Sequence, residues 1–217
     1  MNQANTSHGL SIHRSEALTD GIYAVAMTLL VIELKLPEHN LIHGADALAQ
    51  ALADLLPKVL AWVISFFVLA FFWFGHHRVF SYVRRADGKL VVLNIGQLAF
   101  VSLMPFSCAL IGEHGRELLS QVIYSSNMAG LAVMALLTAR YIHRHPESEL
   151  MAMPAVVYRG TRVRLLGLVL VSLAAVGLNY LVPSLGNMAF MLMAVIMPLS
   201  RRAERASGPS VPDHAPG

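Results

Sequence analysis

The sequence has little charge. Only 13% of its 217 residues are Asp, Glu, Lys or Arg, whereas 56% are hydrophobic, and the mean hydropathy is +0.58. A soluble domain carries about 25% charged residues, so this chain has too little polar surface to cover a globule in water. The shortage of charge excludes an ordinary soluble protein and indicates a chain that lies in a membrane.

Two further features are scarce or absent. The single cysteine, Cys108, lies in an apolar run, so no disulfide framework is possible within the chain. The first residues lack a basic stretch followed by an apolar core and a small-residue cleavage site, and we therefore expect no secretory signal. The sequence also shows no clear internal repeat.

Long uncharged runs are abundant instead. They cover residues 59–75, 90–112, 118–139 and 165–200. A membrane helix needs roughly 20 apolar residues, so the first three runs predict one helix each. The last run is too long for one helix, and the Pro, Ser, Gly and Asn residues between 183 and 187 predict a tight turn near its middle.

With the opening stretch, residues 14–37, these runs predict an all-α integral membrane protein with six spans. The expected spans are about 18–36, 57–75, 90–111, 118–139, 163–182 and 185–200. They form one transmembrane domain over residues 14–202. Residues 1–13 are expected to be a cytoplasmic segment and residues 203–217 a disordered cytoplasmic tail, because the tail is rich in Pro, Gly and Ser.

The basic residues predict the orientation of these spans. Six spans place 13 Lys and Arg residues on the side that holds both termini and only three, Lys35, Lys58 and Arg116, on the other. Cytoplasmic loops carry the excess of Lys and Arg, so both termini are expected in the cytoplasm. This topology, with basic patches that face anionic lipid, explains the net charge of +3 better than nucleic-acid binding does.

The opening stretch is unusually polar for a span. It is charged at both ends, and its uncharged core, Gly21 to Ile32, is short for a helix surrounded by lipid. Such a helix is better placed among other helices or beside water. Residues three and four apart share a face of a helix, and one such face forms what we call the first-helix stripe. The stripe contains Arg14, Leu18, Gly21, Val25, Thr28 and Ile32, with Leu29 at its edge.

Asp20 projects away from this stripe. A carboxylate inside a membrane is costly, so it should face a bundle interior and find a partner. The candidate partners are Arg14, His76, His77 and Asn94, which are all predicted near the cytoplasmic side. The alternative is that Asp20 caps a helix whose first turn lies in the membrane interface.

Arg14, followed after three residues by Leu18-Thr19-Asp20, resembles the Arg-x-x-x-Phe-Ser-Asp signature of the transmembrane protein 175 family. The members of this family are potassium channels of lysosomes and, in single-repeat form, of bacteria and archaea. Leu18 stands for Phe and Thr19 for Ser, and both changes keep the chemical type.

The similarity continues along three segments. Residues 20–37 are similar to the family's first helix, residues 65–80 to its second helix with Trp73 and a His pair, and residues 93–110 to its third helix with Asn94 near the start. The resemblance thus covers about residues 14–110, and the second half of the chain agrees in hydropathy only.

The resemblance implies a homotetramer of six-helix subunits whose first helices line a central pore. Carried over by position, the pore face is Val25, Thr28 and Ile32, which belong to the stripe found from helical periodicity. Rings of Val25 and Ile32 would form constrictions that can gate by dewetting. A ring of Thr28 hydroxyls would offer oxygen dipoles to a partly dehydrated, transient potassium ion, and the family links this layer to potassium preference.

The resemblance also implies a polar network that holds the first helix at its cytoplasmic end. Its members would be Arg14, Thr19 and Asp20 with His77 and Asn94, next to Leu18 and Trp73 of the family's sequence pattern. Gly21 would let neighbouring helices approach closely.

Each of these features has a simpler alternative. Val25 and Ile32 are ordinary residues of membrane helices and can serve packing alone. The Thr28 hydroxyl can bond to the carbonyl four residues earlier in its own helix. Trp73 and the two histidines that follow can be interfacial anchors.

Two rival functions fit the sequence less well. A membrane metalloenzyme would need many more histidines than His76-His77 and His143-x-His145, so we expect no enzyme and no metal site. A passive channel also implies no cofactor, because ions move down their own gradient. A secondary transporter would show repeats and broken helices at mid-membrane, whereas Pro105 and Pro198 are expected near helix ends. No Thr-Val-Gly-Tyr-Gly filter is present. The family resemblance thus implies a passive potassium-selective channel of a prokaryotic inner membrane, and the missing filter implies that its selectivity comes from side chains.

Overall fold

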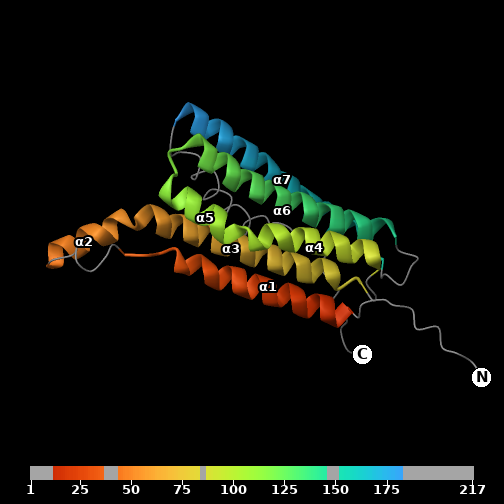
Figure 1. The fold of residues 1–217 in the computed structure, drawn as a ribbon. Coiled ribbons are helices and arrows are strands. Elements are labelled where there is room, and N and C mark those ends of the chain that lie inside the picture. Colours follow the sequence, from red (N-terminus) through yellow and green to blue (C-terminus); the bar gives the residue numbers. More distant parts are fainter. Residues whose placement is uncertain (1–11, 37–43, 84–86, 146–151, 183–217) are drawn as a thin grey trace, which may run out of the picture.

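The computed structural model describes residues 12–36, 44–83, 87–145 and 152–182. The regular elements in these ranges are helices, and the longest of them run side by side along one direction (Figure 1). They are α1 Ile12–Ile32, α2 Ala45–Asp54, α3 Leu56–Phe80, α4 Gly88–Ser102, α5 Met104–Glu113, α6 Leu118–Arg144 and α7 Ala155–Leu181.

Five segments of the described residues are long and apolar enough to cross a membrane. They are His13–Ile32, Leu56–Phe80, Gly88–Glu113, Leu118–Arg144 and Ala155–Leu181. The expected all-α integral membrane fold is therefore confirmed, with α4 and α5 sharing one span. The sixth expected span, residues 185–200, lies outside the described residues, as do the turn before it and the C-terminal tail.

Several helices extend beyond the bounds that hydropathy predicted. α3 continues to Phe80, α6 continues to Arg144, and α7 begins at Ala155 rather than near residue 163. Hydropathy marks the part of a helix that lies in hydrocarbon, whereas charged residues such as Arg are also good helix formers. Conversely, α1 ends at Ile32, four residues before the predicted end at residue 36. Pro37 disfavours the helical conformation at Leu36, the residue directly before it, and so accounts for the last residue of this difference.

The span of residues 88–113 contains a joint at Leu103 that the sequence did not predict. Pro105 lies near a helix end, as expected, but this end is the start of α5 inside the span and not an end of the span itself. Proline lacks the N–H that would bond to the carbonyl of Val101 and its ring crowds that carbonyl. Leu103 keeps helical angles, with φ −80° and ψ −10°, so the backbone at the joint is not unwound.

The helices form two sides of a bundle. α1 packs against α3, α4 and α5, whereas α7 packs against α6 on the opposite side (Figure 1). The apolar core between them includes Leu69, Met104 and Met128, which are almost fully buried. Gly130 of α6 has no side chain, and this lets the ring of Phe100 from α4 lie directly against the helix.

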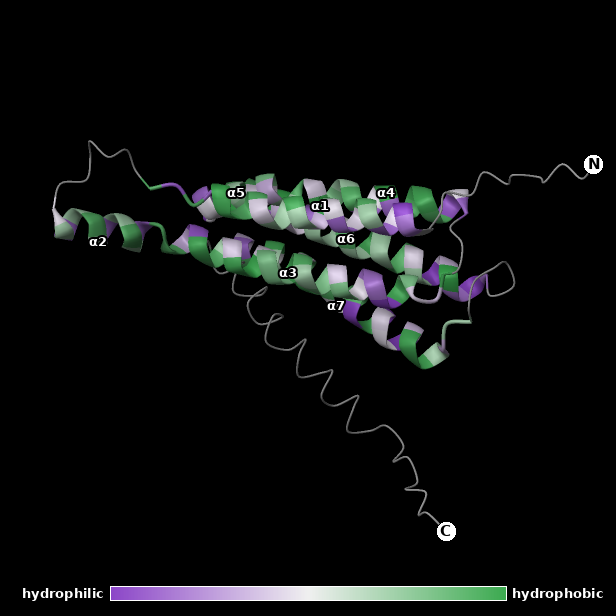
Figure 2. Cartoon of the chain, turned by 90° about the horizontal axis from the view of Figure 1, so that it is seen from below, coloured by the Kyte–Doolittle hydropathy of each residue, from purple (hydrophilic) through white to green (hydrophobic). Residues whose placement is uncertain are grey.

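Polar residues gather at the two ends of the bundle, and hydrophobic ones cover its length (Figure 2). One end carries most of the described basic residues: Arg14, Arg78, Lys89, Arg140, Arg144, Arg159, Arg162 and Arg164. The other end carries Lys35, Lys58 and Arg116. We refer to the first of these as the basic end.

Candidate functional site on the first helix

α1 has one face that packs into the subunit. Ser15, Thr19, Tyr23, Ala26 and Leu30 are all buried, and their spacing of three and four residues places them on one side of the helix. Tyr23 and Leu30 belong to the bundle's apolar core. This face fixes the rotation of α1 about its axis.

The opposite face of α1 is the first-helix stripe. Val25 is 56% exposed and Ile32 is 54% exposed, and Leu18, Thr28 and Leu29 are exposed with them. A methyl group added at Gly21, on the same face, would meet no atom within 4 Å. Packing inside the described subunit therefore does not explain these residues.

The side chain of Thr28 is tied to its own helix, as the simpler alternative predicted. Its Oγ1 donates to the carbonyl of Val25 at 2.8 Å and lies 3.1 Å from the carbonyl of Ala24. A hydroxyl has one proton and two lone pairs. Because the proton points to the backbone, the oxygen offers its lone pairs to the exposed face, where they can accept a hydrogen bond or contact a cation.

A buried amide joins α1 to α4. Asn94 Nδ2 donates to Thr19 Oγ1 at 3.0 Å and to Ser15 Oγ at 3.1 Å, and Thr19 in turn donates to the carbonyl of Ser15 at 2.9 Å. Thr19 and Asn94, two members of the predicted network, are thus bonded to each other. Ser15 was missed, although it lies one helical turn before Thr19 and so shares its face.

A second buried contact between the same helices was also missed. Gln97 Nε2 donates to the Tyr23 hydroxyl at 3.0 Å, and both side chains are almost fully buried. The signal is again periodic, because Gln97 follows Asn94 by three residues and Tyr23 follows Thr19 by four. Polar pairs therefore repeat along one α1–α4 seam, which consists of Ser15, Thr19 and Tyr23 with Asn94 and Gln97.

Asp20 makes a separate contact with α3. Trp73 Nε1 donates to Asp20 Oδ1 at 2.8 Å, and His77 Nε2 lies 3.9 Å from the same oxygen. The Asp20 side chain is 48% exposed, so our expectation of a buried carboxylate is wrong for the subunit. The helix-cap alternative is wrong as well, because α1 begins at Ile12 and Asp20 lies in its third turn.

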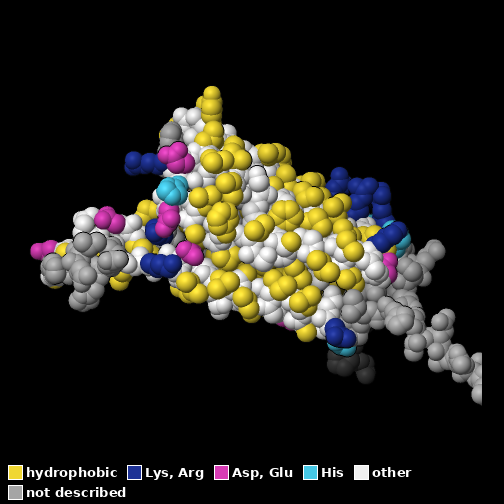
Figure 3. Space-filling view, viewed as in Figure 1, with side chains coloured by type: hydrophobic (Ala, Val, Ile, Leu, Met, Phe, Trp, Pro, Cys, Tyr) yellow, Lys and Arg dark blue, Asp and Glu magenta, His cyan; other side chains and the backbone are white. Residues whose placement is uncertain are grey.

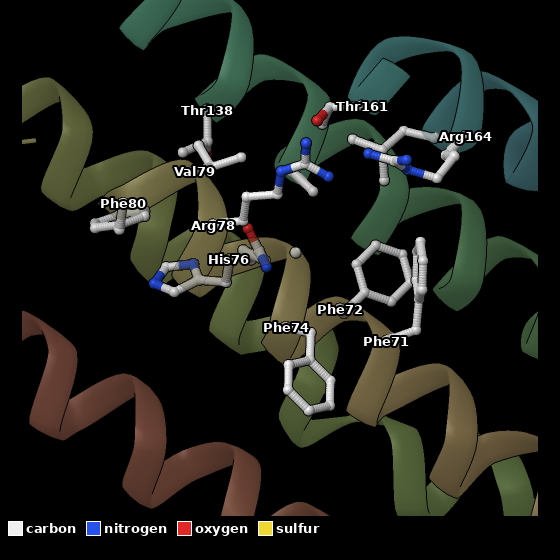
Figure 4. A pocket seen from close by; sticks show the side chains of 14 residues that line it. Phe71, Phe72, Phe74, His76, Arg78, Val79, Phe80, Thr138, Thr161 and Arg164 are labelled. Carbon is white, nitrogen blue, oxygen red and sulfur yellow. The ribbon is translucent and has the colours of Figure 1, made fainter. Parts of the chain in front are cut away.

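The remaining predicted members of the network lie elsewhere. Arg14 is exposed and makes no polar contact within the described ranges. His76 is buried and stacks on Phe80, with ring centroids 3.9 Å apart, instead of bonding to Asp20. It lines a cavity of about 50 Å³ that Arg78 and Thr161 also border (Figure 4). The structure therefore divides the predicted single network into the α1–α4 seam and the contact between Asp20, Trp73 and His77.

The other histidines form no metal site in the described part of the chain. No group of three or more His, Cys, Asp or Glu side chains comes close enough there to hold an ion. His143 stacks on Tyr158 with ring centroids 4.2 Å apart, and His145 Nδ1 lies 3.0 Å from the carbonyl of Tyr141. The first contact joins α6 to α7, whereas the second lies within the last turn of α6.

Comparison with known proteins agrees with the predicted resemblance. Residues 14–105 match the family described as the endosomal/lysosomal potassium channel TMEM175. A potassium channel of Streptomyces collinus is 37% identical over 124 residues, which are 55% of this chain and 59% of that protein. The endosomal/lysosomal proton channel TMEM175 of Homo sapiens is 31% identical over 148 residues, which are 62% of this chain and 29% of that protein. The alignments thus span little more than half of the bacterial relative.

The structural comparison extends the likeness to most of the chain. The crystal structure of a lysosomal potassium-selective channel TMEM175 homolog from Chamaesiphon minutus superposes with a TM-score of 0.71 and 26% identity. The superposition covers 87% of this chain and 96% of that one. The family and these relatives are ion channels rather than enzymes, as the sequence led us to expect.

Proposed function

We propose that this TMEM175-family chain is one subunit of a passive potassium channel. In this proposal four copies surround a pore that is lined by the first-helix stripe. One observation supports it most: α1 carries an apolar stripe with a single hydroxyl layer that no described part of the subunit covers. The bacterial relatives are named potassium channels, and we infer from these names that potassium is the permeant ion.

The stripe has the chemistry that such a pore needs. Four copies of Val25 and of Ile32 would form two apolar rings on either side of a ring of Thr28. A narrow apolar ring controls ion passage by losing its water. Between the two rings, the four Thr28 oxygens would replace part of the hydration shell of a potassium ion, because their protons are engaged by the backbone.

The contacts behind α1 would hold this stripe in place. The α1–α4 seam anchors the face opposite the stripe, and the bond from Trp73 to Asp20 anchors one flank to α3. Since hydrogen bonds constrain direction as well as distance, they fix the rotation of α1 and hence which residues face the pore. No cofactor is needed, because the ion moves down its own gradient.

Potassium is favoured over protons as the permeant ion. The relatives that are named proton channels align with 21–29% of their length, whereas the Streptomyces collinus and Chamaesiphon minutus potassium channels align with 59% and 61%. A transporter is the second candidate of the sequence analysis. The helical joint at Leu103 does not favour it, because the backbone there is not unwound.

We place the basic end in the cytoplasm of a prokaryotic cell, with the protein in the inner membrane. The excess of described Arg and Lys residues at this end supports the orientation.

Ion flux in proteoliposomes tests the function. We expect downhill potassium flux that exceeds sodium flux without any coupling ion. Flux that requires a second ion would instead identify a transporter. Acidification that is driven by a proton gradient and unaffected by potassium would identify a proton channel.

A further inference from the structure

A groove lies between α6 and α7 at the basic end. Its side chains have no role in the proposed channel function. Arg140 and Arg144 border it from α6, and Arg162 and Tyr158 border it from α7. Its volume is about 580 Å³, within the range of roughly 300–1,000 Å³ that is typical of ligand sites. Figure 3 shows Lys and Arg atoms gathered where α6 ends and α7 begins.

The three arginines of this groove are exposed and have no ion-pair partner among the described residues. The acidic side chains that do form ion pairs there lie at other positions. Three unpaired guanidinium groups on one groove favour an anion, and guanidinium matches the geometry of a phosphate. A Glu or Asp pair would have indicated a purely structural arrangement instead.

Two stacked rings line the groove. The His143 ring lies parallel to the Tyr158 ring, with an interplanar angle of 9° and centroids 4.2 Å apart. His143 Nδ1 is buried and has no hydrogen-bond partner among the described residues. This stack joins the last turn of α6 to the first turn of α7, the two segments that carry the arginines of the groove.

Apolar residues continue the groove toward the middle of the bundle. On α7 the exposed Leu166, Leu170 and Leu173 follow Arg162 at helical spacing, and on α6 the exposed Leu137 and Val133 precede Arg140 in the same way. Each helix therefore presents a basic end followed by an apolar stripe on one face. This arrangement matches a phospholipid, which has a charged headgroup and apolar chains.

We infer that this groove binds an anionic phospholipid of the leaflet that the basic end faces. The arginines would hold the headgroup phosphate, and the leucine stripes would hold the acyl chains. The position agrees with the proposed function, on which this inference rests for its membrane setting: α6 and α7 lie on the side of the bundle away from α1, so the groove would face lipid rather than a central pore (Figure 1). Basic pockets between membrane helices suit such headgroups.

Native mass spectrometry of the purified, full-length protein in detergent tests this inference without any ion flux. The probes are phosphatidylglycerol, phosphatidylcholine with the same acyl chains, and inorganic phosphate. We expect phosphatidylglycerol to bind at least tenfold more tightly than phosphatidylcholine, and 10 mM phosphate to leave that binding unchanged. Equal binding of the two lipids, or displacement by phosphate, would overturn the assignment to an anionic lipid.

Variants locate the site. Arg140→Gln and Arg162→Gln should each weaken phosphatidylglycerol binding about fivefold, as expected for one basic residue near a membrane surface. The control is Arg159→Gln, because Arg159 is also exposed on α7 but does not line the groove. It should change binding by less than twofold. Equal losses in Arg159→Gln and Arg162→Gln would show a diffuse surface charge and would overturn the site.

A charge-conserving variant covers the case in which the Gln variants fail to fold. Arg140→Lys together with Arg162→Lys keeps the charge and should retain binding within about fivefold, because Lys attracts a phosphate but cannot bond to it in the two-pronged manner of Arg. If this folded variant lost all preference for phosphatidylglycerol, charge would not carry the binding, and the inference would fail. Loss of ion flux with normal lipid binding would count against the channel proposal alone.

Discussion

The α1–α4 seam gives the most quantitative prediction, because the structure supplies both partners and a reference pair. Asn94 is 2% exposed, and its amide donates to Thr19 and to Ser15 at 3.0 and 3.1 Å. Hydrogen bonds between membrane helices contribute about 0.6 kcal/mol on average and about 1.7 kcal/mol at most. Asn94→Leu removes both bonds and keeps the branching of the side chain, so we expect the free energy of unfolding to fall by about 1 kcal/mol.

A single substitution does not isolate one bond, because Asn94 Oδ1 is buried without a partner among the described residues and its removal offsets part of the loss. A double-mutant cycle does isolate it. Combining Thr19→Val with Asn94→Leu should give a coupling energy of about 0.6–1 kcal/mol. Combining Thr28→Val with Asn94→Leu is the matched control, since Thr28 bonds only to its own helix in the described structure.

The assay is unfolding in mixed micelles with increasing SDS, followed by tryptophan fluorescence at a fixed protein concentration. The chain has only two tryptophans, Trp62 and Trp73, and both lie on α3, which packs against α1. A coupling energy for Thr19 and Asn94 below about 0.3 kcal/mol, or equal to that of the control cycle, would refute the reasoning that this seam positions α1.

Three further predictions follow. Thr28→Val should lower the preference for potassium over sodium roughly tenfold, the equivalent of about 1.4 kcal/mol; an unchanged reversal potential would remove this side chain from the filter. Asp20→Ala and Trp73→Phe should each reduce the fraction of tetramer in light-scattering chromatography. Asp20→Asn keeps the acceptor oxygen for Trp73 and should leave this fraction unchanged. A normal fraction of tetramer in both Asp20→Ala and Trp73→Phe would show that the contact is dispensable. Gly130→Ala should destabilise the fold by about 1–3 kcal/mol, because its methyl group collides with a phenyl ring. Gly167→Ala, with no atom within 4 Å, should be neutral or stabilising in the same unfolding assay.

Helical periodicity predicted the architecture of α1 well. The spacing of Leu18, Val25, Thr28 and Ile32 placed these residues on one face, and the structure leaves that face exposed. Hydropathy likewise found each of the described spans, because a hydrocarbon core requires about 20 apolar residues whatever the fold. Helical periodicity and hydropathy both depend on residues that are close in the sequence, so they can be evaluated without knowing how the helices pack.

The polar contacts were predicted less well, because they depend on how helices rotate against one another. The sequence offered Arg14, His76, His77 and Asn94 as partners of Asp20 with equal weight. Only the packed bundle shows that Trp73 donates a hydrogen bond to the Asp20 carboxylate and that Asn94 donates to Thr19 and Ser15. The joint beside Pro105 was not predicted for a related reason: hydropathy is continuous across it, and only backbone geometry reveals that α4 and α5 are separate helices.

The accessibility of α1 side chains to permeant ions tests the central proposal most directly. Cys108 is the only cysteine and is buried, so a Cys108→Ala background allows one cysteine to be placed at a time. Thr28→Cys tests the stripe, and Leu173→Cys is the control, because Leu173 is 64% exposed on α7 and away from α1. The measurement is potassium flux in proteoliposomes before and after silver ions are added.

Silver ions are small and monovalent, enter a potassium pathway through water, and bind thiolates tightly. If the first-helix stripe lines the pore, silver will abolish flux through Thr28→Cys and leave flux through Leu173→Cys and the Cys108→Ala parent unchanged. Full flux through Thr28→Cys in the presence of silver would contradict the proposal, because the ions would then cross the protein by a path that does not pass this side chain.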